Sequence, residues 1–215
     1  MPDLTRMRRD YDRAGLREED LAATWVEQFD RWFADAVAAD LPEPNAVVVA
    51  TADADGAPDA RILLIKGYDA SGFVFGTSYA SAKGAQLAVN PRAALVFPWH
   101  AMQRQVRVIG RVERTGDAVS DALWDPRPRG SQLAAAASIQ STVVESRDEL
   151  VERLRRLEEQ FPEGPVPRPS SWGGYRVVPE RVEFWQGGPD RLHDRLRFLR
   201  DDAEGGGWIL QRLAP

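Results

Sequence analysis

The stretch "RLHDR", residues 191–195, places one imidazole between two guanidinium groups at two-residue steps. On a β-strand this spacing turns Arg191, His193 and Arg195 toward one face. His193 is one of only two histidines, and the preceding "EFWQGG" adds an indole and an amide. An aromatic ring, an imidazole and two cations would suit a planar, anionic ligand. A charged edge strand that discourages aggregation is the alternative interpretation.

Two further stretches carry cations that could bind phosphate or another polyoxygen anion. "RPRGSQ" sets Arg127, Arg129 and Ser131 where a helix is expected to begin, and helix N-termini favour phosphate. A solvated loop before a capped helix is the alternative. In "RILLIK", Arg61 and Lys66 bracket four aliphatic residues, as in a buried strand with charged ends. On an ideal strand these two cations face opposite sides, so one shared ligand requires a bulge or a strand that ends before Lys66.

Composition excludes several classes of protein. The 215 residues suffice for one domain with a buried core, and there is no apolar run of about eighteen residues that could span a membrane. Zero cysteines exclude disulfides, thiol nucleophiles and thiolate metal sites. The polar N-terminus is unlike a secretory signal, so a cytoplasmic location is expected. A net charge of −5 argues against broad nucleic-acid binding.

Several catalytic motifs are also missing from the sequence. It contains no dinucleotide-binding Gly-x-Gly-x-x-Gly after a strand, no phosphate-binding Gly-Lys-Ser/Thr loop and no Gly-x-Ser-x-Gly nucleophile elbow. The two histidines are far apart in sequence, so no metal site is expected. The polar groups that remain are mostly arginine, lysine, glutamine and serine, which suit anion binding.

Hydrophobic periodicity predicts the elements that must position these residues. Residues 1–17 are polar and predict a flexible arm, and apolar residues at helical spacing predict a helix over 18–40. Strands are expected within 45–78, 92–115 and 175–215, with a short helix capped by Ser81 between the first two groups. Helices are expected over 117–161, the last one opened by a capping box at Ser146 and Glu149. The order predicts one α+β domain over 18–215, a mostly antiparallel sheet or barrel with peripheral helices.

Taken in order, "RILLIK", "RPRGSQ", "WGGYRV", "EFWQGG", "RLHDR" and the terminal "RLAP" resemble the pyridoxine/pyridoxamine 5′-phosphate oxidase family. The resemblance runs from about Met7 to Pro215. It implies an FMN-binding split β-barrel and a homodimer with FMN at the subunit interface. The implied reaction oxidises pyridoxine or pyridoxamine 5′-phosphate to pyridoxal 5′-phosphate, with O2 as acceptor and hydrogen peroxide as product.

The resemblance also implies roles for particular residues. Arg191 and His193 would lie over the pyridine ring, with Arg191 stabilising developing negative charge and His193 orienting the substrate or managing its proton. The residues implied for the substrate are Arg8, Tyr11, Lys66, Arg127, Ser131, Arg191 and His193. The residues implied for FMN are Arg61, Ile62, Leu63, Leu64, Ile65, Lys66, Thr77, Lys83, Gln105, Gln140, Ser141, Trp185 and Arg195.

The chain departs from the family pattern at four places around these ligands. Leu123 stands where a tyrosine usually touches the substrate phosphate, Ala82 where an arginine is common, and Gly76 where an aromatic residue is common. Alanines 134–137, with Ala136 among them, replace a segment that normally contains tryptophan. Two alternatives stay open: an FMN-dependent oxidase acting on another cyclic substrate in secondary metabolism, and a non-catalytic flavin- or pyridoxal-phosphate-binding module. A plain structural domain is a third reading.

Overall fold

A computed structural model describes residues 2–7, 10–12, 15–201 and 206–215 of the chain. It contains two compact units, and each is described by itself. The terminal unit comprises Met1–Val49, Ala94–Gly110 and Pro179–Pro215, and the central unit comprises Ala50–Ala93 and Arg111–Val178. The predicted flexible arm over 1–17 and single domain over 18–215 stay predictions.

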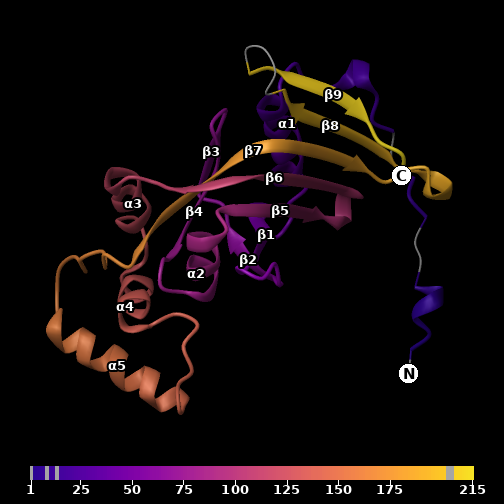
Figure 1. Ribbon diagram of the computed structural model, residues 1–215. Coiled ribbons are helices and arrows are strands. Elements are labelled where there is room, and N and C mark those ends of the chain that lie inside the picture. The colour runs from indigo at the N-terminus through magenta and orange to yellow at the C-terminus, as the bar shows by residue number, and fades with distance from the viewer. Residues whose placement is uncertain (1, 8–9, 13–14, 202–205) are drawn as a thin grey trace. The chain divides into compact units, whose positions relative to one another are not determined.

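Groups of consecutive strands are separated by helices along the chain (Figure 1). The helices are α1 (Trp25–Ala38), α2 (Ala82–Val89), α3 (Asp117–Trp124), α4 (Arg129–Ala137) and α5 (Arg147–Gln160). The strands are β1 (Ala46–Ala52), β2 (Pro58–Leu64), β3 (Gly67–Asp69), β4 (Gly72–Ser78), β5 (Arg92–Trp99), β6 (Arg104–Arg114), β7 (Trp172–Gln186), β8 (Asp194–Arg200) and β9 (Trp208–Arg212). The strand order is β2-β1-β5-β6-β7-β4-β3, with β8 paired to β7 and β9 to β8. The pairings β3–β4, β4–β7, β7–β8 and β8–β9 are antiparallel, which confirms the predicted α+β class.

In the terminal unit, α1 begins at Trp25 rather than at Glu18, so the predicted start is wrong. Thr24 and Glu27 form a reciprocal capping box at this point, which satisfies the first backbone N–H groups of the helix. Residues Glu18–Asp20 form only a 3-10 turn. The apolar face of α1 is buried, and Trp32 packs edge-on against Phe184 of β7 at a ring-centroid distance of 5.2 Å.

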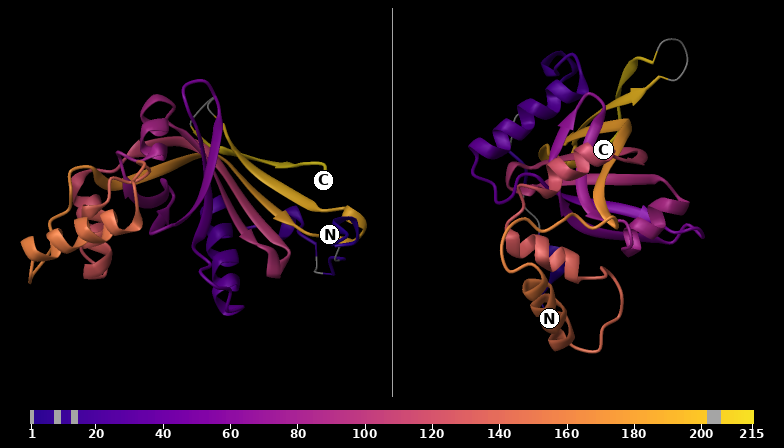
Figure 2. Two further views of the ribbon diagram at one scale, coloured as in Figure 1. Left: turned by 90° about the horizontal axis from the view of Figure 1, so that it is seen from below. Right: turned by 90° about the vertical axis from the view of Figure 1, so that its left-hand side faces the viewer.

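In the central unit, the predicted caps at Ser81 and Ser146 are confirmed, because each serine side chain accepts a hydrogen bond from the backbone three residues later. Glu149 does not complete the capping box, because its carboxylate accepts from the N–H of Glu145 instead. An apolar cluster of Trp124, Leu133, Val166 and Trp172 forms part of the core. Helix α5 runs beside α4 in both views of Figure 2 and buries none of its residues fully. No helix of the described ranges combines the length and apolar character that crossing a membrane requires.

Candidate functional site

The predicted site residues are divided between the two units, and they form two groups that are described separately. The central half-site contains Arg61, Ile62, Leu63, Leu64, Ile65, Lys66, Thr77, Lys83, Arg127, Ser131, Gln140 and Ser141. The terminal half-site contains Tyr11, Gln105, Trp185, Arg191, His193 and Arg195. Arg8 lies outside the described residues.

A chain of hydrogen bonds links three predicted cofactor residues in the central half-site. Lys83, in the first turn of α2, is only 5% exposed, and its Nζ donates to Thr77 Oγ1 at 3.3 Å and to Ser81 Oγ at 3.2 Å. Thr77 Oγ1 donates in turn to Gln140 Oε1 at 3.2 Å. Strand β4, the N-terminus of α2 and the loop after α4 therefore meet at this network.

The Lys83 ammonium has no carboxylate partner in the part of the chain that the structure describes. Burial lowers the pKa of Lys83, and the nearby positive charge of Arg61 lowers it further, while the negative charge of Asp59 offsets part of this shift. Arg61 is held by Thr51 Oγ1 at 2.6 Å and by the carboxylate of Asp59. A buried cation that contacts only hydroxyl groups favours an anion beside it, because the anion would restore its preference for the charged form.

Arg127 precedes α4 and is the second cation of this half-site. Its guanidinium lies 5.0 Å from the ring centroid of Trp172 and 5.5 Å from that of Trp124, within cation–π range. Burial lowers the pKa of Arg127, and its buried Nε has no hydrogen-bond partner. Its Nη2 donates to the carbonyl oxygen of Ser131 at 3.2 Å. The two rings therefore hold a guanidinium whose hydrogen-bonding capacity is partly unused.

Arg127 lines a cavity of about 240 Å³ within the central unit. The lining includes network residues Thr77 and Gln140, and its other members are Leu63, Gly76, Ser78, Ala135, Ser138 and Trp172. The structure thus brings Leu63, Thr77, Gln140 and Arg127 to one cavity, with Lys83 bonded to Thr77.

The remaining central residues are placed as follows. Strand β2 ends at Leu64, and the backbone N–H of Lys66 donates to Val74 of β4 at 2.8 Å. The strand therefore ends before Lys66, one of the two conditions under which Arg61 and Lys66 can serve one ligand. Ile65 is buried, whereas Ile62, Ser131 and Ser141 are exposed. Ser141 adopts a φ of 73°, a left-handed conformation that is uncommon for serine.

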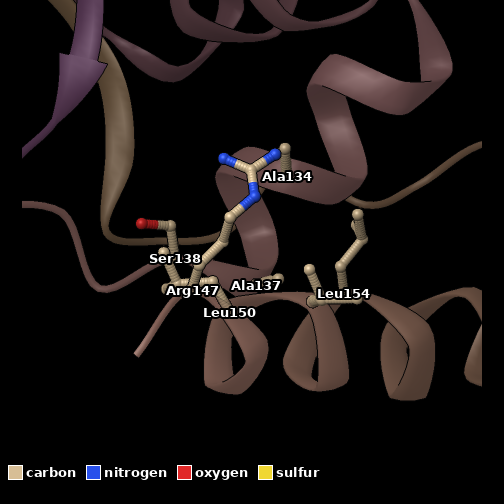
Figure 3. A pocket seen from close by; sticks show the side chains of 7 residues that line it. Ala134, Ala137, Ser138, Arg147, Leu150 and Leu154 are labelled. Carbon is tan, nitrogen blue, oxygen red and sulfur yellow. The ribbon is translucent and has the colours of Figure 1, made fainter. Parts of the chain in front are cut away.

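A second cavity of the central unit, about 370 Å³, lies between α4 and α5 (Figure 3). Its lining is mostly apolar, and the side chain of Arg147 extends along it in Figure 3. It contains none of the predicted site residues. The predicted residues that line a cavity, Leu63, Thr77, Arg127 and Gln140, therefore all lie at the smaller one.

In the terminal half-site, the prediction that "RLHDR" forms one strand face is wrong. Strand β8 begins at Asp194, and Arg191 belongs to a 3-10 turn with a φ of 66°. The turn requires glycine at position 188, because a Cβ there would lie 2.3 Å from the carbonyl oxygen of Leu192. The signal was present in the sequence, since "GGPD" directly before Arg191 consists of turn-forming residues.

The turn nevertheless gathers three of the predicted residues around Tyr11. The rings of Trp185 and His193 lie 4.7 Å apart, and the Tyr11 ring lies 5.9 Å from the first and 5.6 Å from the second. The Arg191 guanidinium lies 5.9 Å from the Tyr11 ring. The neighbouring Asp12 exchanges hydrogen bonds with Gln103 at 3.2 and 3.1 Å. This ring cluster of Tyr11, Trp185, Arg191 and His193 forms an aromatic and cationic surface.

His193 has a defined hydrogen bond. Its Nδ1 accepts from the backbone N–H of Gly188 at 3.2 Å. In the neutral imidazole the proton then resides on Nε2, which makes Nε2 a donor.

Arg195 is the cross-strand partner of Trp185, so the two side chains share one face of the β7–β8 pair. Its Nε donates to Glu183 Oε1 at 2.9 Å, and this bond raises the pKa of Arg195. Sequence reasoning missed Glu183. The available signal was a single carboxylate within the apolar strand segment "RVEFW". Gln105 of β6 is half-buried.

The structure also gives physical reasons for the departures from the family pattern. The Trp172 ring covers Gly76, and a Cβ there would lie 2.7 Å from Trp172 Cη2. Trp172 therefore occupies the space that a side chain at position 76 would need. Leu123 and Ala136 are half-buried and pack against the apolar cluster that contains Trp172. Nothing in the structure explains Ala82.

The central half-site can bind an anion, and the terminal half-site can bind a flat ring. Within the described ranges, no group of three or more His, Cys, Asp or Glu side chains is placed to hold a metal ion. Cations without carboxylate partners point to phosphate, and the ring cluster points to a flat heterocycle.

Comparison with known proteins agrees with this chemistry. The family model described as pyridoxamine 5′-phosphate oxidase matches residues 33–185, and the model described as the pyridoxine 5′-phosphate oxidase C-terminal dimerisation region matches residues 172–215. The chain is 54% identical over 215 residues to the pyridoxine/pyridoxamine 5′-phosphate oxidase of Burkholderia vietnamiensis (strain G4 / LMG 22486), with 100% of both chains covered.

Solved structures show the same fold. PhzG from Burkholderia lata 383, in complex with tetrahydrophenazine-1-carboxylic acid, matches with a TM-score of 0.85 and 30% identity, covering 92% of this chain and 95% of PhzG. A pyridoxamine 5′-phosphate oxidase-related, FMN-binding protein from Nostoc punctiforme PCC 73102 matches with a TM-score of 0.68 and 18% identity, covering 90% and 99% of the two chains. The predicted α+β split-barrel fold is confirmed.

Proposed function

Because the chain belongs to the pyridoxamine 5′-phosphate oxidase family, we propose that it is an FMN-dependent oxidase that produces pyridoxal 5′-phosphate. Its substrate is pyridoxine 5′-phosphate or pyridoxamine 5′-phosphate. Two electrons and two protons leave the 4′ position and reduce O2 to hydrogen peroxide, and with the amine a water molecule enters and ammonia leaves. The observation that carries the proposal is the hydrogen-bonded chain of Lys83, Thr77 and Gln140 beside the cavity that Arg127 lines.

The residues of the central half-site fit FMN. The Lys83 ammonium is buried against two hydroxyl groups with no carboxylate, and a phosphate would provide the missing negative charge. Bound FMN supplies the two-electron acceptor that the side chains lack, and O2 restores its oxidised form. The chain itself supplies binding and orientation.

Assembly is part of the same proposal. The match of residues 172–215 to a dimerisation region supports a homodimer, and we place FMN at the interface between its subunits. The exposed Ile62, in the segment assigned to FMN, is 68% accessible in the single chain and is available for burial by a second subunit.

For the substrate, Arg127, Ser131 and Lys66 are assigned to the phosphate. Arg127 suits this role because the tryptophan rings keep its guanidinium in place while its Nε has no partner. In the terminal half-site, Arg191 and His193 are assigned to the pyridine ring, and Tyr11 and Arg8 to closure over it.

The hydrogen bond from Gly188 gives His193 a specific role. With Nδ1 occupied, the neutral ring presents Nε2–H to the substrate as a donor. His193 therefore orients the 4′ substituent or the hydroxyl group attached to the pyridine ring through this donor, while Arg191 stabilises developing negative charge.

The decisive experiment is anaerobic mixing of the FMN-loaded protein with pyridoxine 5′-phosphate, monitored by loss of flavin absorbance. We expect reduction in the parent protein and much slower reduction in Arg191→Ala and His193→Asn. Peroxide release in air should match the amount of aldehyde formed. An oxidised flavin that substrate does not reduce would refute the proposed oxidase. Parent rates in both variants would refute the residue assignment.

A second candidate is an FMN-dependent oxidase acting on another ring substrate. The PhzG complex shows that a structurally similar chain holds a tricyclic carboxylic acid, and Leu123 makes the central unit more apolar than a tyrosine would. The 54% identity to a pyridoxine/pyridoxamine 5′-phosphate oxidase, against 30% to PhzG, favours the phosphorylated vitamer. Peroxide assays with both substrate classes separate the two candidates.

A further inference from the structure

Glu183, near the C-terminal end of β7 in the terminal unit, is a carboxylate that is only 6% exposed. Its Oε1 accepts a hydrogen bond from Arg195 Nε at 2.9 Å, and its Oε2 accepts one from Arg107 Nη1 at 3.3 Å. Each carboxylate oxygen therefore meets one guanidinium group. Burying a charge is costly unless it is paired and hydrogen-bonded, so this placement needs both arginines.

The register between β7 and β8 determines the direction of the Arg195 side chain. Trp185 and Arg195 are directly opposite across β7 and β8, and Glu183 is two residues before Trp185 on the same face. The Arg195 side chain therefore leans along β7 toward Glu183 rather than projecting freely from the sheet. The ring cluster begins at Trp185, beside Arg195 on this face.

A second contact fixes the other end of the guanidinium. Arg195 Nη1 donates to the carbonyl oxygen of Ala214 at 2.9 Å, and the Leu213 N–H donates to the Arg195 carbonyl at 2.9 Å. Two of the three guanidinium nitrogens are thus occupied. In the described parts of the chain Nη2 has no hydrogen-bond partner, so its N–H groups are the ones left for a ligand.

We propose that Glu183 is a positioning residue for the cofactor: it holds the Arg195 guanidinium in place, so that the remaining N–H groups of Arg195 are oriented toward FMN before FMN binds. This inference rests on the proposed function, which assigns Arg195 to FMN. An arginine held by two fixed acceptors loses little conformational freedom when its ligand arrives. The second arginine, Arg107, satisfies the other oxygen of the buried carboxylate.

A double-mutant cycle on FMN affinity tests this role. FMN is titrated into cofactor-free parent, Glu183→Gln, Arg195→Gln and the double variant, and binding is followed by quenching of flavin fluorescence. We expect Glu183→Gln to weaken FMN binding at least tenfold in the parent background and less than twofold when Arg195 is already Gln. A merely structural role of Glu183 would weaken binding equally in both backgrounds and would overturn the proposal.

Two further variants control for folding and charge. Arg107→Gln removes the other guanidinium from Glu183 and leaves the Arg195 contact, so FMN affinity should stay within threefold of the parent. Glu183→Asp retains the charge and should recover part of the affinity; if Glu183→Gln does not fold, the same cycle is run with Glu183→Asp. Equal losses in Arg107→Gln and Glu183→Gln would overturn the proposal.

The failure of this inference is distinguishable from failure of the proposed function. A parent protein that binds no FMN refutes the proposed function. A parent that binds FMN, with an Arg195→Gln variant that binds it weakly and a Glu183→Gln variant that binds it normally, refutes only the positioning role. The midpoint potential of bound FMN gives an independent readout and should shift in Glu183→Gln while staying unchanged in Arg107→Gln.

Discussion

The cations of the two half-sites differ in whether a carboxylate is their partner. In the central half-site, Lys83 and Arg127 are buried without carboxylate partners, and burial lowers the pKa of both. In the terminal half-site, Arg195 is paired with Glu183, and this hydrogen bond raises its pKa. The rings of Tyr11, Trp185 and His193 contact one another in the same half-site.

The difference indicates a division of labour. A desolvated cation without a counter-ion destabilises the cofactor-free protein and is stabilised by an anion, which suits phosphate binding. A cation paired with a carboxylate adds little net charge, but the pairing fixes the orientation of its remaining N–H groups. Aromatic rings provide a surface against which a flat ligand can pack. The central half-site should therefore govern affinity for phosphate groups, and the terminal half-site should govern the orientation of rings. The following predictions test this division, from the largest expected effect to the smallest.

Arg127→Met should cause the largest loss of substrate binding. Removing a charged hydrogen-bond partner costs about 1.5–3 kcal/mol, roughly ten- to a hundredfold in KM for pyridoxine 5′-phosphate. FMN affinity should change little. Arg129→Met is the matched control, because Arg129 is two residues away and contacts the carbonyl oxygens of Phe161 and Gly164. A KM that rises equally in both variants would contradict the special role of Arg127.

Lys83→Met should weaken FMN binding by about tenfold or more. The variant should also lose the change of FMN affinity with pH that we expect of the parent in the alkaline range. Binding requires the charged ammonium, so in the parent protein FMN affinity should fall as pH rises through the lowered pKa of Lys83. Titrations across the alkaline range measure this slope.

The stability of the cofactor-free protein should change in the opposite direction. Between the lowered pKa and the ordinary value of 10.5, the unfolded chain binds more protons at Lys83 than the folded chain does. The free energy of unfolding should therefore rise with pH in this window. Denaturant titrations of parent and Lys83→Met would contradict the assignment if both showed the same pH dependence.

Tyr11→Leu tests the ring cluster. Each aromatic contact contributes about 0.5–1.5 kcal/mol, so losing the contacts to Trp185 and His193 should raise the substrate KM about fivefold. Tyr11→Phe keeps the ring and should stay within about twofold of the parent. If the two variants lose equal affinity, the hydroxyl group rather than ring packing is responsible.

Leu123→Tyr should have the smallest effect and the opposite sign. A restored phenol hydrogen bond is worth about 0.5–1.5 kcal/mol, and we expect roughly threefold tighter binding of pyridoxine 5′-phosphate because the tyrosine must also fit against the apolar cluster. Equilibrium titration under anaerobic conditions measures it. Unchanged or weaker binding would favour a different ring substrate.

Local sequence signals predicted much of the fold. Ser81 and Ser146 cap the expected helices, and alternating polarity located the strands, because capping and strand burial depend on nearby residues. The strand predicted over residues 191–195 failed, because Gly188 permits a tight turn and Arg191 adopts a positive φ. Periodicity alone does not detect such a turn, whereas the composition of "GGPD" does.

The candidate site shows the same limit. Motif order predicted the arginines, the histidine and the lysines of the two half-sites, since those residue types carry the chemistry wherever the chain places them. The partners of these residues required the tertiary structure. Glu183 is separated from Arg107 by most of two strands and the helices between them, and Trp172 reaches Arg127 from a distant strand.

The amino-acid sequence by itself determined the family and the fold class, and it supplied the residues that we predict to bind FMN and a phosphorylated ring. Only the tertiary structure decided which cations remain without a carboxylate and which are paired. The physical reason is that burial and pairing depend on contacts between residues far apart in the chain, and these contacts decide whether a charge attracts a ligand or supports its neighbour.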